Sequence, residues 1–417
     1  MTEATSATPA PAALADVLAD APFVRLVATD DGDALAAAGL LARALRATGT
    51  PFQVRVSADP VPDTDADEVT VTVGAERGTH AIAGSTRPAT SDAYAVATAL
   101  GTEPDPVVAL AGIVAAGSVP GTDGSGDALA AAEATDRISR RPGVAIPTAD
   151  LAAGVAASTL LRTPYSGDPE ATRAILADLG LPATLDDDAH RRLASRIAVD
   201  VAAAEDASNR AAVAAERALR PYAIAAEAGP FETIGGYADV LDVLAREAPG
   251  TGVALALDAD PADDLRTAAI DVWRRHGLTA HRAISAATVG RYSGCVIARV
   301  DVADAAETAD TADTSNASQP GETVLPTIAR LVRDFRSPES VAVAVDETTG
   351  QLAVASRDRI GLGDTCRSVA VEFDGRGWGT ADRGGIAVGA SVPADNDAGT
   401  TDGADITGAL AALREAL

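Results

Sequence analysis

Three aspartates lie close together in the stretch TDDGD at residues 29–33. Asp31 and Asp33 are two residues apart, so both carboxylates could face one hard divalent cation, which prefers oxygen ligands. The stretch follows the short apolar run 23–28, and open α/β sheets place their ligand sites at the carboxyl ends of strands. The alternative is that these are ordinary helix-start acids, because the positive end of a helix dipole favours carboxylates.

A second stretch with chemical potential is DGRGWGTADRGGIAVG, at residues 374–389. Glycines let backbone N–H groups approach a phosphate closely, arginines can fork onto phosphate oxygens, and tryptophan can stack on a base. The candidate nucleic-acid-binding residues are Arg376, Gly377, Trp378, Gly379, Arg383, Gly384 and Gly385. The alternative interpretation is a hairpin turn with a packed tryptophan.

Strands that alternate with helices surround these stretches and predict an α/β fold with a parallel sheet. Short apolar or alternating runs predict the strands, and apolar residues at helical spacing predict the helices. The strands expected in the first part of the chain are 23–28, 52–56, 69–73 and 80–82. Those expected in the second part are 253–257, 283–287, 294–300, 341–345 and 352–355. Residues 186–219 predict one long helix or two close ones.

The charge of the chain is strongly negative and its cations are of one kind. The 417 residues include 60 acidic ones and 33 basic ones, all arginine, for a net charge of −27. At molar salt the Debye length is only about 3 Å, so this acidity need not repel nucleic acid and instead predicts a protein of a halophile, soluble in brine.

Two cysteines, Cys295 and Cys366, form no C-x-x-C pattern, which excludes a structural zinc site of cysteines. The sequence does not decide whether they pair. It shows neither a signal-peptide pattern at its start nor an apolar run of membrane-spanning length, which favours a cytoplasmic protein without membrane contact.

The two chemical stretches together resemble the DHH phosphoesterases, in particular the archaeal RecJ-like single-strand exonucleases, which include the GINS-associated nuclease. In that family a first strand ends in a D-x-D-G signature, and Asp31 and Asp33 match its two metal-binding aspartates. Thr29 replaces the family's preceding histidine. The glycine-rich stretch is similar to the family's G-G-G-H-type phosphate-binding loop, with Trp378 in place of the usual histidine. The segments 141–144, 166–168 and 235–241 also resemble archaeal RecJ relatives.

The departures from the family concern its remaining metal ligands. Two-metal phosphodiester hydrolysis in this family needs about five acidic and histidine ligands. Residues 71–74 end a strand without the second aspartate, residues 80–85 lack the D-H-H signature, and residues 111–118 lack the fourth aspartate. The residues that could complete a ligand set instead are His80, Asp123 and Asp127.

The resemblance therefore implies a catalytically degenerate RecJ-like protein that binds single-stranded DNA or RNA, or acts as a scaffold, in DNA replication or repair. We expect no catalytic residue and no cofactor, with Asp31 and Asp33 as the remnant of a metal site. By analogy with the helicase complex of MCM, GINS and an inactive RecJ-like factor, GINS and MCM proteins are the implied partners. The alternatives are an active single-strand exonuclease dependent on Mn²⁺ or Mg²⁺, and an interaction module that binds only proteins.

The implied fold is α/β, with a parallel-sheet DHH-like lobe joined by helices to a smaller α/β C-terminal lobe. The expected parts are a flexible tail at 1–20, a DHH-like domain at 21–200, a helical connector and sheet extension at 201–286, a DHH-associated C-terminal domain at 287–392 with a disordered loop at 301–322, and a tail with a terminal helix at 393–417.

Overall fold

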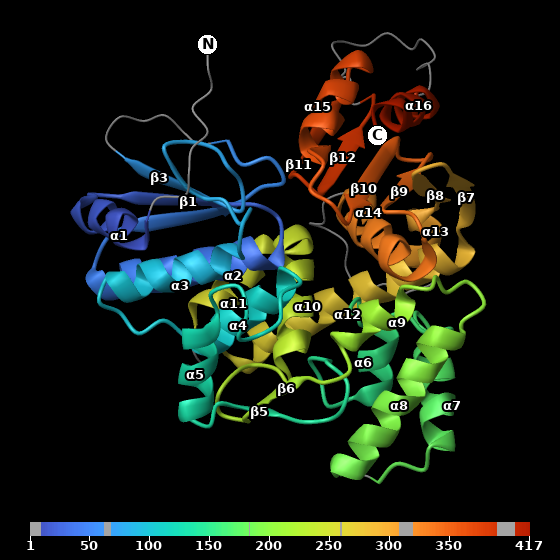
Figure 1. The fold of residues 1–417 in the computed structure, drawn as a ribbon, viewed down its shortest axis with the longest axis horizontal. Coiled ribbons are helices and arrows are strands. Elements are labelled where there is room, and N and C mark those ends of the chain that lie inside the picture. The colour runs from blue at the N-terminus through green and yellow to red at the C-terminus, as the bar shows by residue number, and fades with distance from the viewer. Residues whose placement is uncertain (1–9, 62–67, 183, 259–260, 308–319, 390–404) are drawn as a thin grey trace. The chain divides into compact units, whose positions relative to one another are not determined.

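The computed structural model describes residues 10–61, 68–182, 184–258, 261–307, 320–389 and 405–417, which form two compact units (Figure 1). Unit 1 comprises residues 1–160, 176–195 and 217–274, and unit 2 comprises residues 161–175, 196–216 and 275–417. Three of the boundaries fall inside helices, namely α7 (Pro169–Asp178), α8 (Asp187–Ala203) and α12 (Asp263–Ala286).

A parallel sheet forms the framework of unit 1. Its described residues make a four-stranded sheet in the order β2, β1, β3, β4. These strands are β1 (Val24–Ala28), β2 (Phe52–Val56), β3 (Val69–Val73) and β4 (His80–Ile82). All neighbouring strands run parallel, and Val24 of β1 lies opposite Phe52 and Val69. The predicted α/β fold with a parallel sheet is confirmed, and the carboxyl ends of the strands meet at the edge where β1 enters the acidic turn.

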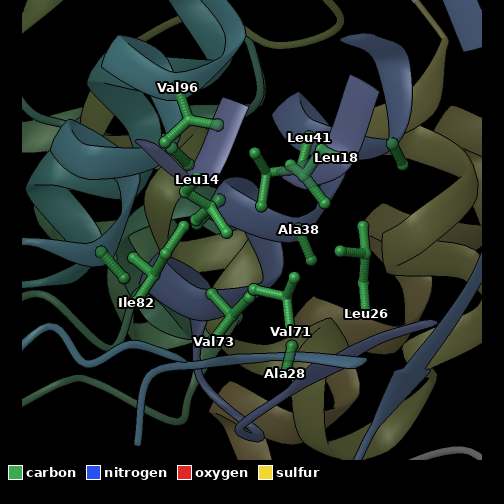
Figure 2. Packing of buried hydrophobic residues seen from close by; sticks show 14 of the residues in the cluster. Leu14, Leu18, Leu26, Ala28, Ala38, Leu41, Val71, Val73, Ile82 and Val96 are labelled. Atoms are coloured by element: carbon green, nitrogen blue, oxygen red, sulfur yellow. The ribbon is translucent and has the colours of Figure 1, made fainter. Parts of the chain in front are cut away.

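Helix α2 (Gly32–Thr48) is the central helix of unit 1 and contacts α3 (Ala89–Ala99), α4 (Pro106–Ala115), α10 (Ile234–Glu247) and α11 (Pro249–Leu257). Small residues allow these close approaches: a Cβ added to Gly39 would lie 2.4 Å from the Cβ of Ala256. Figure 2 shows the core between the sheet, α2, α3 and α1 (Pro11–Asp20), with Leu14, Leu18, Leu26, Ala28, Ala38, Leu41, Val71, Val73, Ile82 and Val96 labelled.

Unit 2 is built on a second, mixed sheet. Its described residues form a six-stranded sheet in the order β11, β12, β10, β9, β8, β7. These strands are β7 (Thr288–Tyr292), β8 (Cys295–Arg299), β9 (Val341–Asp346), β10 (Gln351–Ser356), β11 (Arg376–Gly379) and β12 (Arg383–Ala387). Strands β8 and β9 are parallel, and the other neighbours are antiparallel.

Helices cover this second sheet. Helix α14 (Pro320–Leu331) packs on β9 and β10 and continues into the π-helical turn η1 (Val332–Arg336), and α15 (Leu362–Glu372) packs on β11 and β12. The remaining elements of the chain are α5 (Gly126–Ala134), α6 (Leu151–Ala157), α7 (Pro169–Asp178), α9 (Ala211–Glu216), α13 (Val302–Glu307), α16 (Ile406–Ala416) and the antiparallel pair β5 (Ile138–Arg140) and β6 (Tyr222–Ile224).

Two strands predicted from apolar runs are wrong. Residues 253–257 belong to helix α11, and residues 283–286 belong to helix α12. A short buried apolar run looks the same in a strand and in a helix, so periodicity does not separate the two. Residues 186–219 form two helices, α8 and α9, as one of the two alternatives predicted.

The described parts of the expected tails and loop contain helices, one of which is the expected terminal helix. Residues 11–20 of the expected tail form α1, and its Leu14 and Leu18 are buried in the core of unit 1. The terminal helix α16 likewise buries Leu410 and Leu413 in the core of unit 2. The predicted disordered loop 301–322 includes α13 and the start of α14. Residues 1–9, 308–319 and 390–404 lie outside the described residues, so those parts of the three predictions stay open.

Candidate functional site

Asp31 is the N-cap of helix α2. Its backbone is extended, with φ −135° and ψ 161°, and its Oδ1 accepts a hydrogen bond from the backbone N–H of Ala34 at 2.8 Å. The buried hydroxyl of Thr29 donates to Asp31 Oδ2 at 2.5 Å. Both carboxylate oxygens therefore serve the local structure, as the helix-start alternative predicts.

Asp33 caps a different helix. It lies in the first turn of α2, and its carboxylate accepts hydrogen bonds from the N–H groups of Ala89 at 2.7 Å and Thr90 at 2.9 Å, at the start of α3. The Thr90 hydroxyl donates to the Asp33 carbonyl oxygen at 2.9 Å, which closes the contact. The N-cap of α3 is Pro88, whose side chain makes no capping bond, so Asp33 supplies the cap from elsewhere in the fold.

The electrostatics of Asp33 follow from this position. Its side chain is buried, and burial raises the pKa of Asp33 from 3.8 to about 7, with a further upward contribution from the nearby negative charge of Asp31. The hydrogen bonds from Ala89 and Thr90 act in the opposite direction. A buried carboxylate without a cation favours its neutral form, because desolvation penalises the charge.

The position that follows strand β3 has no room for a side chain that could act as a further ligand. Gly74, which follows β3, has φ +86°, and a Cβ added there would lie 2.0 Å from the Thr29 Oγ1. Gly84, which follows β4, also has a positive φ of +67°. Both positions favour glycine, so an aspartate side chain in place of Gly74 would collide with Thr29.

The residues considered as replacement ligands do not complete a site. His80 opens strand β4 and pairs with Val71, so it precedes the carboxyl end of its strand. The Asp123 carboxylate accepts from the hydroxyl of Thr122 at 3.1 Å, and Asp127 lies in the first turn of α5. Within the part of the chain that the structure describes, no group of three or more His, Cys, Asp or Glu residues is placed to hold a metal ion. The donor set does not fit a two-metal centre.

One acidic neighbour of the turn was missed by the sequence reasoning. Asp242 of α10 accepts a hydrogen bond from the backbone N–H of Gly32 at 3.2 Å, and its Oδ1 pairs with Arg246 at 2.9 Å. The segment 235–241, which resembles RecJ relatives, ends immediately before Asp242. This resemblance could have identified Asp242 from the sequence. Since Arg246 is buried beside it, the Asp242 charge is balanced within α10.

The glycine-rich stretch forms the hairpin of β11 and β12, in which Trp378 lies opposite Gly385. Trp378 is buried, and a Cβ added to Gly385 would lie 2.6 Å from its ring. The guanidinium of Arg376 lies over the same ring, 5.3 Å from the centroid. Trp378 thus packs on its own sheet, as the hairpin alternative predicts.

The glycines of this hairpin permit close packing on α15. A Cβ added to Gly377 would lie 2.3 Å from the carbonyl oxygen of Cys366, and one added to Gly384 would lie 2.6 Å from the Cys366 sulfur. This contact explains the glycine density without a ligand. The arginines of the hairpin are more open: Arg376 is exposed and Arg383 is half-buried, and both stay candidate phosphate contacts.

Comparison with known proteins gives a relative that matches most of the chain. The uncharacterized protein rrnAC1427 of Haloarcula marismortui is 44% identical over 390 residues, covering 91% of this chain and 93% of that protein. The family described as the C-terminal domain of rrnAC1427 matches residues 287–415, which include all but the last residue of α16.

Among solved structures, CDC45 from Entamoeba histolytica matches 90% of this chain and 95% of its own chain, with a TM-score of 0.58 and 9% identity. RecJ from Thermus thermophilus, in complex with Mn²⁺, matches 100% of this chain and 55% of its own, with a TM-score of 0.48 and 12% identity. The CDC45 match shows a shared fold. Among the described helices, none combines the length and apolar character that a membrane crossing requires.

Proposed function

The chain belongs to the family of the Haloarcula marismortui protein rrnAC1427, and we propose that it is a non-catalytic protein of the DHH/RecJ-like fold. One observation carries this proposal: the two aspartates that match metal ligands cap helices α2 and α3, while Gly74 packs against Thr29 where a further ligand would stand. Two-metal hydrolysis needs about five acidic and histidine ligands, and no group of three or more His, Cys, Asp or Glu residues is placed to hold a metal ion among the residues that the structure describes.

In this proposal the protein acts by binding, as a single-stranded nucleic-acid-binding or scaffolding factor in DNA replication or repair. The sequence resemblance to RecJ-like proteins and the fold shared with CDC45 support the role by analogy. Arg376 and Arg383 of the hairpin are the phosphate contacts of the proposal, and Trp378 packs beneath Arg376 as part of the scaffold. Replication proteins of the GINS and MCM type are the proposed partners.

The absence of catalysis is tested with labelled single-stranded DNA and RNA in concentrated KCl containing Mn²⁺ or Mg²⁺. We expect the full chain to degrade neither substrate faster than the Asp31→Asn variant does. Asparagine keeps an oxygen that can accept the Ala34 N–H and so retains most of the cap. Degradation by the wild type that the variant lacks would replace this proposal with that of a metal-dependent exonuclease.

The binding role is tested by fluorescence anisotropy of a labelled oligothymidylate over a series of KCl concentrations. The double variant Arg376→Gln/Arg383→Gln is expected to weaken binding, with the slope of log affinity against log salt smaller by about 1 for each lost phosphate contact. Arg191→Gln, which removes an exposed arginine of α8, is the matched control. If the wild type binds neither DNA nor RNA, the protein-only scaffold is the better description.

A further inference from the structure

Two arginines of unit 2 contact the last turn of helix α12. Arg162 comes from the segment before α7, and Arg336 is the last residue of η1. Arg162 Nη2 approaches the Ser285 hydroxyl at 3.4 Å, and Arg336 Nη1 donates to the carbonyl oxygen of Ile284 at 2.8 Å. Two distant segments thus bring their guanidinium groups to one point of the fold.

The ion pairs of Arg162 and Arg336 lead to the same carboxylate. Asp206, in the segment between α8 and α9, lies 2.7 Å from Arg336 Nε and 3.7 Å from Arg162 Nη2. The longer distance exceeds that of a hydrogen bond. Burial, aided by the charge of Arg336 and opposed by that of Asp206, lowers the pKa of Arg162 to about 10. One carboxylate therefore serves two cations here.

Nη1 of Arg162 is buried at this place and has no hydrogen-bond partner among the described residues. The same is true of Nη1 of Arg282, an arginine of α12 whose Nε donates to the turn after Arg162. The Arg162 side chain is only 9% exposed. A buried donor that makes no hydrogen bond is costly, and more so when it is charged. The dipole at the end of α12 favours cations and accounts for the Arg336 bond to Ile284, but it satisfies neither of these nitrogens.

The surroundings hold these side chains in place. The backbone N–H of Thr163 donates to the Ser166 hydroxyl at 2.9 Å, which fixes the turn after Arg162. Arg282 Nε donates to the Gly167 carbonyl oxygen of the same turn at 3.0 Å. Such preorganisation lowers the entropic cost of binding a ligand. Solvent reaches the edge of the cluster, because Ser285 is exposed and Asp206 is 40% exposed.

We propose that Arg162 and Arg336 form a binding site for a phosphoryl anion and that Asp206 occupies its entrance when no ligand is bound. A phosphate offers more acceptor oxygens and more charge than one carboxylate, and planar guanidinium forks match its geometry. Being largely desolvated, the site is screened by salt less than surface charges are, which suits a protein predicted to work in brine. The assignment goes beyond the proposed function because it requires a phosphate group and no nucleic acid.

The test measures binding of inorganic phosphate to the full chain by calorimetry, in KCl of constant ionic strength, with potassium chloride alone as the reference. Wild type is expected to bind phosphate. Asp206→Asn removes the competing negative charge and is expected to bind it more tightly, while Arg162→Gln weakens binding by about tenfold or more, the value of one charge-assisted hydrogen bond. Arg191→Gln, which changes an exposed arginine of α8 outside the cluster, is expected to bind as wild type does.

Asp206→Asn is expected to strengthen phosphate binding and Arg162→Gln to weaken it. The test therefore stays decisive even if Arg162→Gln folds poorly. If Asp206→Asn leaves phosphate affinity unchanged, or if wild type gives no phosphate signal, the assignment is overturned. An oligothymidylate distinguishes the source of the phosphate: tighter binding of both ligands by Asp206→Asn identifies a nucleic-acid backbone, and tighter binding of phosphate alone identifies a free phosphate or nucleotide. Because hairpin variants should leave phosphate binding intact, failure of the proposed function and failure of this site are separable.

Discussion

Replacing Asp33 with alanine would separate a helix cap from a metal ligand. The carboxylate accepts N–H bonds from Ala89 and Thr90 at 2.7 and 2.9 Å, and both residues are completely buried at the start of α3. Because Pro88 makes no side-chain capping bond, the variant leaves both N–H groups without their acceptor. The cap joins α2 to α3, so its loss acts on tertiary structure as well as on one helix end.

The expected cost follows from the buried donors. Each buried N–H group left without an acceptor costs about 1–3 kcal/mol, so we expect Asp33→Ala to lower the free energy of unfolding by about 3 kcal/mol at pH 5. At that pH the neutral form of Asp33 is favoured in the folded protein, since burial raises its pKa to about 7. Burying a charge therefore costs the wild type little under these conditions.

The cost should depend on pH with a definite sign. Between its ordinary pKa of 3.8 and its folded value of about 7, Asp33 holds a proton in the folded state that the unfolded chain releases. The free energy of unfolding of the wild type then falls by at most about 1.4 kcal/mol per pH unit across this window and is level above it. The Asp33→Ala variant has no carboxyl group at this position and does not lose stability in this way. The difference in free energy of unfolding between wild type and variant should therefore shrink by up to about 3 kcal/mol from pH 5 to pH 8.

Urea denaturation followed by circular dichroism at pH 5, 6.5 and 8, in the same KCl concentration, measures both effects. Asp16→Ala, which removes an exposed acid of α1, is the control and should change stability by less than about 0.5 kcal/mol at each pH. A disadvantage of Asp33→Ala that grows with pH would refute the reasoning, because it would mean that the fold uses the ionised carboxylate. No disadvantage at pH 5 would refute the capping role.

Three further outcomes test the strand ends, the hairpin and the C-terminal core. Gly74→Ala should cost about 3 kcal/mol in urea denaturation, because its Cβ meets Thr29, whereas Gly49→Ala, with a similar positive φ and open space, should cost about 1 kcal/mol. Trp378 should show a fluorescence spectrum and a weak acrylamide quenching typical of a buried indole, unchanged by oligonucleotide; quenching on DNA addition would revive base stacking. Cys366, whose pKa burial raises to about 12, should react with a thiol reagent only after unfolding, and prompt reaction in the folded protein would contradict its burial.

Features that depend on near neighbours in the chain could be predicted from the sequence. The run 23–28, the alternation of 52–56 and 69–73 and the glycine-punctuated turns led to the parallel sheet that the structure contains. The acidic turn at the start of α2 was located for the same reason, since Asp31 caps the helix that follows it directly. Periodicity did not distinguish a strand from a helix at residues 253–257, where the apolar run is too short to show its period.

The tertiary structure decided what the chemical residues do. The sequence pairs Asp33 with Asp31, but the fold places it against α3, more than fifty residues away, as that helix's cap. The fold also packs Trp378 on Gly385, so that this candidate for stacking on a base is buried. It also collects Arg162 and Arg336 at one carboxylate. A local pattern states which groups a segment carries, whereas burial and partners arise only when distant segments meet, and these determine whether a charge is solvated, paired or available to a ligand.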